Sequence, residues 1–512
     1  MTATRRLADR LADRNGARAP VRPAADGTVD LADVQGLVGA GFGRLPEALF
    51  LGVGFDTGAV GRALLAELVP EVTSLAGRRT SRAVNLALTH AGLARLGLPQ
   101  AALDSFSLEF AGGMVTPTRS AFLGDEGEHA PETWVWGGPG TSRVDILLLL
   151  YADTPAELSS LAASLRRTVA AHGATEAVAL ATTPLSRGNH LGFADGISQP
   201  AVAGLPGATG DGDVALGEFL LGYPNAYGRL TSRPLLPIAA DPGRLLPPAP
   251  DAAGSVDLGR NGTYLVARTL AQDVAAFWEY ARRWAGRTGL TPELVAAKMV
   301  GRWPSGTSLT ISPEHDDPER ADDNAFRYHD ADPAGLGCPI ASHVRRANPR
   351  DSLDPRPGSD ASLQVTDRHR LIRRGREYGP PPGTGPTTDG ERGLHFLCLN
   401  ASIGRQFEFV QHTWLNNPAF AGLQQSPDPI VTPRLPDADL FPCPALPVRH
   451  RLLQLPTFTR VRGGGYFFLP GIRALRYLAT HPAGAPAASG TGESTRTTPE
   501  QRSRPTDIED SP

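Results

Sequence analysis

Apolar and polar positions along the chain alternate between patterns typical of strands and patterns typical of helices. Residues 48–54 form a short apolar run that predicts a strand, and 57–68 have the spacing of a helix. The strongest strand is predicted at 144–152. It leads into Thr154-Pro155-Ala156-Glu157, a capping box with proline at the first helical position, so we expect a helix from there to Gly173.

The second half of the chain shows the same alternation of predicted strands and helices. We expect a strand at 262–269 and then a helix at 270–284, where apolar side chains recur at helical spacing. Thr291-Pro292 opens a further helix. The remaining strands are predicted at 394–400 and 465–469. Strands that alternate with helices in both halves predict an α+β fold, which we expect to contain antiparallel sheets.

The two ends of the chain differ from the rest. One is polar and rich in Ala and Arg, the other is rich in Pro, Gly, Ser and Thr, and neither is expected to bury enough apolar surface to fold. A Gly- and Pro-rich stretch near 200–215 is the expected boundary between two domains. The predicted division is a tail at 1–28, an N-terminal domain at 29–212, a C-terminal domain at 213–482 and a second tail at 483–512.

Composition narrows the class of protein. The 512 residues are 41% hydrophobic and 20% charged, which is enough apolar material for a large core. The net charge of -3 lacks the basic excess expected of a nucleic-acid-binding protein. No apolar run approaches the roughly 20 residues of a membrane helix. The cysteines Cys338, Cys398 and Cys443 are far apart and odd in number, so we expect no disulfide framework and a reducing, cytoplasmic location.

Three segments carry candidate chemistry. The first is Gly192-Phe193-Ala194-Asp195-Gly196, in which an aspartate between glycines is also what a simple turn requires. The second, CPIASHVRRANPR, contains His343, which on its own is equally a hydrogen-bonded or surface histidine. The third, HRLIRRGREYGP, contains Arg373, and an Arg-rich turn of this kind is often a solvated loop.

Together the three segments resemble the dye-decolorising (DyP-type) haem peroxidases. The resemblance implies that Asp195 is the acid–base residue on the distal side of the haem and that Arg373 is the distal arginine. It implies that His343 is the proximal iron ligand. The apolar pair that shapes the distal pocket falls on Leu394 and Phe396. The further residues placed at the cofactor are Gly192, Gly196, Arg345 and Arg346, the two arginines as partners of the haem propionates or as structural residues.

Other segments resemble the family in the right order, so that the resemblance runs from about residue 30 to about 480. Among them are GEFLLGYPNAYG, MVGRWPSG, RQFEFVQHTWLNNP and RGGGYFFLPG. The implied fold is two ferredoxin-like domains with antiparallel sheets, similar to a dimeric α/β barrel, with the haem in the C-terminal domain. The implied cofactor is haem b, one per chain and not covalently bound.

Some positions depart from the family pattern or stay open. Ala194 stands where relatives often carry a charge. His395 lies between Leu394 and Phe396, and strand alternation predicts that it points to the opposite face, as a core or interface histidine. The proximal histidine needs a hydrogen-bond acceptor, for which Glu408 and the acids after it are candidates. The aromatic residues considered as electron relays, with packing as the alternative, are Trp303, Tyr378 and Trp414.

The function that the resemblance implies is reduction of hydrogen peroxide with oxidation of a small-molecule donor such as a dye or phenol. The alternative is a haem carrier or haem-iron handling protein, which needs the proximal ligand but neither Asp195 nor Arg373. An aspartate has an ordinary pKa of about 3.9, so we expect the best dye turnover at acid pH. No nucleic-acid or membrane partner is expected, and a homo-oligomer is left open.

Overall fold

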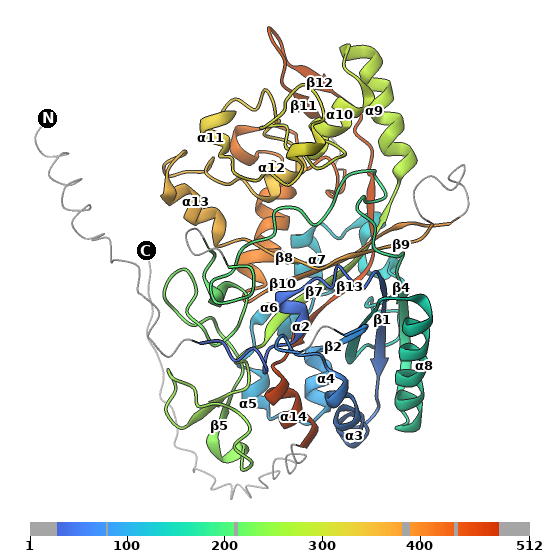
Figure 1. Ribbon diagram of the computed structural model, residues 1–512, viewed down its shortest axis with the longest axis vertical. Helices are drawn as coiled ribbons and strands as arrows, with labels where there is room; N and C mark the ends of the chain where they lie inside the picture. The colour runs from blue at the N-terminus through green and yellow to red at the C-terminus, as the bar shows by residue number, and fades with distance from the viewer. Residues whose placement is uncertain (1–27, 78–79, 209–212, 381–389, 435–438, 481–512) are drawn as a thin grey trace, which may run out of the picture.

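The computed structural model describes residues 28–77, 80–208, 213–380, 390–434 and 439–480 (Figure 1). The predicted tails lie outside the described residues, apart from residue 28. Within the described ranges no helix is long and apolar enough to cross a membrane.

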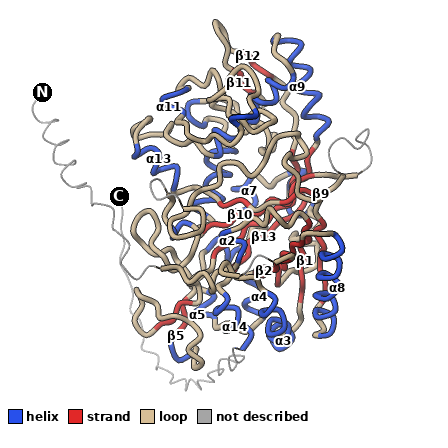
Figure 2. Tube along the Cα trace, viewed as in Figure 1, coloured by secondary structure: helices blue, strands red, loops and turns tan. Residues whose placement is uncertain are grey.

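One nine-stranded antiparallel sheet runs through the molecule, shown in red in Figure 2. Its strands follow the order β4-β1-β3-β2-β13-β7-β10-β8, and β9 also pairs with β10. The bounds are β1 (Glu47–Gly54), β2 (Arg82–Leu88), β3 (Ile146–Ala152), β4 (Thr175–Ala181), β7 (Thr263–Gln272), β8 (Ile372–Arg373), β9 (Arg376–Tyr378), β10 (Gly393–Asn400) and β13 (Thr459–Leu469). Two short hairpins are β5 (Leu235–Pro237) with β6 (Ser255–Asp257) and β11 (Phe441–Cys443) with β12 (His450–Leu452).

The sheet has two halves that follow the chain. Four strands come from residues 47–181 and the other five from 263–469, and the halves meet where β2 pairs with β13 through one register pair, Leu88 with Phe468. This arrangement matches the antiparallel α+β fold expected from the sequence. The exact boundary between the two domains stays a prediction.

Helices cover the sheet on both sides. The helices between β7 and β10, α9 to α13, lie in the upper part of Figure 1, while α3, α4, α5 and α14 lie at the bottom and α8 lies beside β1 and β4. The helices are α2 (Gly36–Gly39), α3 (Gly58–Leu68), α4 (His90–Arg95), α5 (Gln100–Leu103), α6 (Leu108–Gly112), α7 (Pro117–Leu123), α8 (Pro155–Ala171), α9 (Val274–Thr288), α10 (Pro292–Val300), α11 (Tyr328–Ala331), α12 (His343–Ala347), α13 (Asp360–Asp367) and α14 (Ile472–Thr480). Two π-helical turns, η8 (Gly404–Glu408) and η9 (Val410–Leu415), follow β10.

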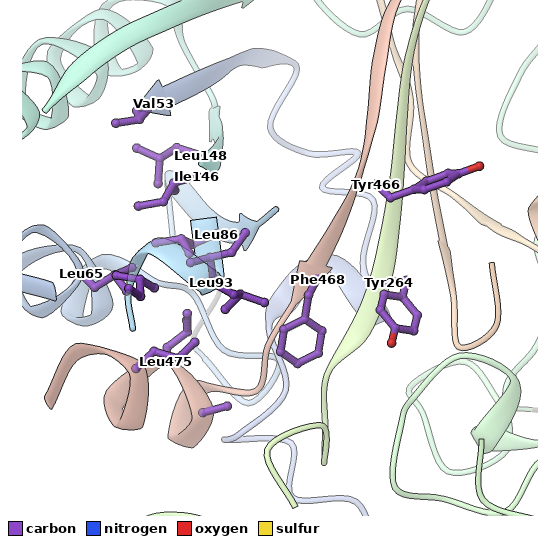
Figure 3. Packing of buried hydrophobic residues seen from close by; sticks show 14 of the residues in the cluster. Val53, Leu65, Leu86, Leu93, Ile146, Leu148, Tyr264, Tyr466, Phe468 and Leu475 are labelled. Atoms are coloured by element: carbon purple, nitrogen blue, oxygen red, sulfur yellow. The ribbon is translucent and has the colours of Figure 1, made fainter. Parts of the chain in front are cut away.

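The largest apolar cluster lies between the sheet and the helices below it (Figure 3). Leu65 of α3 and Leu475 of α14 pack there with Leu148 of strand β3, and all three are fully buried. Helix α14 is the last described element, yet it packs against α3 near the start of the chain. The two ends of the described chain are therefore held in one core.

Most predicted elements are confirmed, with shifts at their ends. Thr154 caps α8 by accepting a hydrogen bond from the Glu157 N–H at 3.2 Å, as the capping box predicts. The helix predicted from residue 270 begins instead at Val274. The reason is that β7 continues to Gln272, because its last residues still pair with β10 and β13. Pairing with neighbouring strands overrides the helical spacing of residues 270–272, and Asp273 becomes the N-cap of α9.

Candidate functional site

The pairing register of β10 gathers three candidate side chains, together with Glu377, on one face of the sheet. Directly paired residues on antiparallel strands share a face, and Cys398 pairs with Arg373 while Leu394 pairs with Glu377. Alternation along β10 puts Phe396 on the same side. We call the face that carries Arg373, Glu377, Leu394 and Phe396 the Arg373 face. Leu394 and Phe396 are only half-buried, although β10 is paired on both sides.

The opposite face of β10 is closed. His395 is 4% exposed. Its ring Nδ1 is hydrogen-bonded to Thr269 Oγ1 at 3.0 Å, and its Nε2 donates to the Ala181 carbonyl at 3.2 Å. It stacks on Tyr378 with ring centres 4.6 Å apart. Burial lowers the pKa of His395 to about 4. The prediction that it is a core histidine turned away from Leu394 and Phe396 is confirmed.

Asp195 lies on a compact turn at the edge of the Arg373 face. Gly192 and Gly196 have φ of +89° and +78°, a conformation that glycine adopts without strain. Asp195 is exposed, and one of its carboxylate oxygens accepts the Gly196 N–H at 2.6 Å. Phe193 is buried beside Trp278, with the two rings stacked at 6.4 Å. The motif is thus a well-anchored turn that presents its aspartate outward.

Arg373 ties this turn to the sheet. Its guanidinium donates to the Ile197 carbonyl at 2.6 Å, two residues after Asp195. Gln199 adds two more bonds to the Arg373 backbone: its amide oxygen accepts the N–H at 3.1 Å, and its amide nitrogen donates to the carbonyl at 3.3 Å. We call residues 189–199 the Asp195 loop. The loop and Arg373 therefore form one hydrogen-bonded unit.

His343 begins helix α12, and its ring is oriented by a buried carboxylate. Nδ1 donates to Asp428 Oδ2 at 2.9 Å, while the other oxygen of Asp428 accepts the N–H groups of Ile430 and Val431, both at 2.9 Å. Asp428 is fully buried, whereas the His343 side chain is 30% exposed. Burial alone would raise the pKa of Asp428, but His343, the Val431 N–H and Arg346 outweigh it and the net pKa is lowered. The bond at Nδ1 leaves Nε2 as the nitrogen for a metal.

The segment 301–306 contacts both helix α12, which begins with His343, and the Asp195 loop. Gly301 has φ of +101°, and a Cβ there would lie 3.0 Å from Ser342 Oγ, next to His343. Gly306 has φ of +107°, and a Cβ there would lie 2.3 Å from Ile197 Cδ1. The Pro304 carbonyl accepts the Ala194 N–H at 2.9 Å. These close approaches explain the glycines of the MVGRWPSG segment.

The sequence left alternatives open for the acceptor of the His343 hydrogen bond and for two arginines. Among the candidate acceptors, Glu408 and the acids after it, Asp428 accepts this bond, whereas Glu408 is engaged with Tyr466 Oη at 2.7 Å and with Arg119. Arg346 is fully buried, and its guanidinium donates to the carbonyls of residues 414, 415, 417 and 426. Arg345 is also buried and donates to the Cys338 carbonyl at 2.7 Å. These hydrogen bonds are those expected of the structural alternative, and a role of either arginine at the haem propionates stays a prediction.

The candidate electron relays are mainly packing residues. Trp303 is 5% exposed and donates to the Ser312 carbonyl at 2.7 Å, and Trp414 is 4% exposed. Tyr378 is half-buried, with its hydroxyl bonded to Glu391 at 3.1 Å.

The residues present fit a haem group. An imidazole with one nitrogen held by a buried carboxylate is the usual arrangement of a histidine metal ligand. The half-buried Leu394 and Phe396 offer apolar surface to a porphyrin, and Arg373 and Asp195 offer a guanidinium and a carboxyl. The described residues contain no group of three or more His, Cys, Asp or Glu side chains that would bind a metal by themselves.

Comparison with known proteins decides the family. No family model matches the chain. A relative from Mycetinis scorodonius, "Peroxidase 2", is 30% identical over 495 residues, covering 88% of both proteins. The chain belongs to the dye-decolorising peroxidase family. "Dye-decolorizing peroxidase AauDyP1" of Auricularia auricula-judae is 29% identical over 454 residues, covering 80% of this chain and 79% of that protein.

Solved structures of the dye-decolorising peroxidase family have the same fold. A dye-decolorizing peroxidase in complex with 2,6-dimethoxyphenol is 26% identical, with a TM-score of 0.70, covering 88% of this chain and all of that one. A DyP-type peroxidase from Anabaena is 23% identical, with the same TM-score and coverage of 88% and 94%. The chain is thus a peroxidase of a haem-dependent family, with the fold that the resemblance implied.

Proposed function

We propose that this peroxidase reduces hydrogen peroxide at a non-covalently bound haem b, one per chain, and oxidises dyes, phenols or other small one-electron donors. The observation that carries the proposal is the hydrogen-bonded unit of Arg373 and the Asp195 loop beside half-buried Leu394 and Phe396. A haem carrier needs only the proximal ligand, so this unit favours the enzyme over the carrier.

Each residue has a distinct task in this proposal. His343 holds the iron through Nε2, and Asp428 fixes the orientation of the ring and increases its electron donation. When bound, the haem supplies the electrons that reduce the peroxide O–O bond. Asp195 accepts a proton from one peroxide oxygen and returns it to the other, which leaves as water. Arg373 stabilises the negative charge that develops on the leaving oxygen, because a guanidinium is permanently charged.

The location of the protein is also part of the proposal. The three cysteines are buried free thiols, which suits a reducing compartment such as the cytoplasm. Hydrogen peroxide and a small-molecule reductant are the proposed partners.

The test uses purified holoprotein and two separate variants. The wild-type protein is expected to show a Soret band that changes on addition of peroxide and to oxidise dyes once peroxide is present. Asp195→Asn and Arg373→Leu are each expected to keep the Soret band but to lower kcat/KM for peroxide by about 10²- to 10⁴-fold. A stable Soret band that peroxide does not change in the wild-type protein would instead support the carrier.

A further inference from the structure

Glu377 is a second carboxyl group on the Arg373 face that the assigned roles do not use. It lies on β9 directly opposite Leu394, while its neighbour Arg376 pairs with His395 and is buried on the other face. Glu377 itself is half-buried. The pairing register therefore directs this carboxyl toward the half-buried side of the sheet.

Glu377 also anchors the Asp195 loop. One of its oxygens accepts the His190 N–H at 2.6 Å, and the His190 ring bonds the Tyr378 carbonyl at 2.8 Å. The loop is thus attached to β9 at its beginning by these two bonds and to Arg373 near its end. Glu377 and Asp195 are consequently held on the same small structural unit.

The surroundings of Glu377 favour a protonated carboxyl. Burial, together with the negative charge of Asp195, raises the pKa of Glu377 to about 7, although the His190 N–H acts in the opposite direction. His190 has a pKa lowered mainly by burial, so it supplies no compensating positive charge at neutral pH. Arg373 lies on the same face but four β10 residues farther along, opposite Cys398, and Arg392, just before β10, acts on His190.

We propose that Glu377 is a positioning and charge-setting residue of the peroxide-reducing site: it anchors the Asp195 loop through the His190 N–H and places a second carboxyl group on the face that this loop borders. The proposal rests on the function proposed above. A neutral Glu377 lets Asp195 return its proton readily to the leaving oxygen. When Glu377 ionises, a second adjacent carboxylate makes Asp195 retain that proton more strongly, because like charges disfavour ionisation of their neighbours. Peroxide reduction therefore slows as the pH rises through about 7.

Infrared difference spectroscopy of the holoprotein tests the protonation directly, without turnover. The wild-type protein is expected to show the carbonyl band of a protonated carboxyl that disappears with a midpoint near pH 7. Glu377→Gln removes this band but keeps an amide oxygen to accept the His190 N–H. Asp195→Asn moves the midpoint to lower pH, because it removes the neighbouring negative charge. A band that persists in Glu377→Gln, or a midpoint that Asp195→Asn does not move, overturns the proposal.

The pH profile of kcat/KM for peroxide supplies a second measurement. The wild-type value is expected to fall above about pH 7, and this fall is expected to be lost in Glu377→Gln, whose side chain stays neutral. Glu391→Gln is the matched control: Glu391 is exposed, pairs with Arg462 and lies outside the Arg373 face, so this variant keeps both the band and the fall. A fall that persists in Glu377→Gln overturns the charge-setting role. Absence of turnover at every pH would contradict the proposed function, while the infrared titration would still decide the protonation of Glu377.

Discussion

Replacement of Asp428 with asparagine removes its hydrogen bond to His343 and keeps the other hydrogen bonds of this side chain. The oxygen that accepts the Ile430 and Val431 N–H groups is retained, whereas the oxygen that accepts His343 Nδ1 becomes an NH₂ group. The variant therefore loses one buried, charge-assisted hydrogen bond, with a net value of about 1.5–3 kcal/mol. Since every 1.4 kcal/mol corresponds to about tenfold, we expect haemin to dissociate roughly 10- to 100-fold faster.

Haemin transfer from the holoprotein to excess apomyoglobin, followed by absorbance, measures this rate. Glu408→Gln is the control, because Glu408 bonds Tyr466 and Arg119 instead of the proximal histidine. Thermal unfolding of each variant checks that the fold is intact. If Asp428→Asn released haemin at the wild-type rate while Glu408→Gln accelerated release, the assignment of the acceptor would be wrong.

Three further predictions concern the core, the glycine beside the Asp195 loop and the buried histidines. Leu148→Ala, in the fully buried centre of β3, should lower the free energy of unfolding in urea by about 2–5 kcal/mol, and an effect below 1 kcal/mol would contradict the packing. Gly306→Ala should cost about 1–3 kcal/mol of stability and also reduce kcat/KM for peroxide, because its Cβ would lie 2.3 Å from the Asp195 loop; unchanged kinetics would refute this contact. His129, His369 and His395 have pKa values lowered to about 4 by burial, so the unfolded chain, in which histidine titrates near 6.5, binds more protons below that pH. The free energy of unfolding should therefore fall as the pH drops from about 6.5 to 4, and urea midpoints that stay constant over this range would contradict buried neutral histidines.

Local sequence signals predicted most elements, and three short motifs taken together pointed to the principal candidate residues. The capping box at Thr154 predicts the start of α8 because its hydrogen bond joins residues three positions apart. Asp195, His343 and Arg373 stand out only in combination, because three motifs in one order resemble a single family while each alone has an ordinary structural explanation. The alternation of side chains along one strand was also enough to predict that His395 points away from the face of Leu394.

Tertiary structure decided the partners of these residues. Asp428 lies 85 positions from His343, and no local pattern distinguishes it from Glu408 as the acceptor. Glu377 reaches the Arg373 face only because β9 pairs with β10 in a particular register, and a slip of one residue would turn it to the other side. Arg346 looks like a ligand for an anion in the sequence, but folding surrounds it with main-chain carbonyls. Side-chain identity and local spacing are written in the sequence, whereas hydrogen-bond partners far apart along the chain exist only once strands and loops have packed.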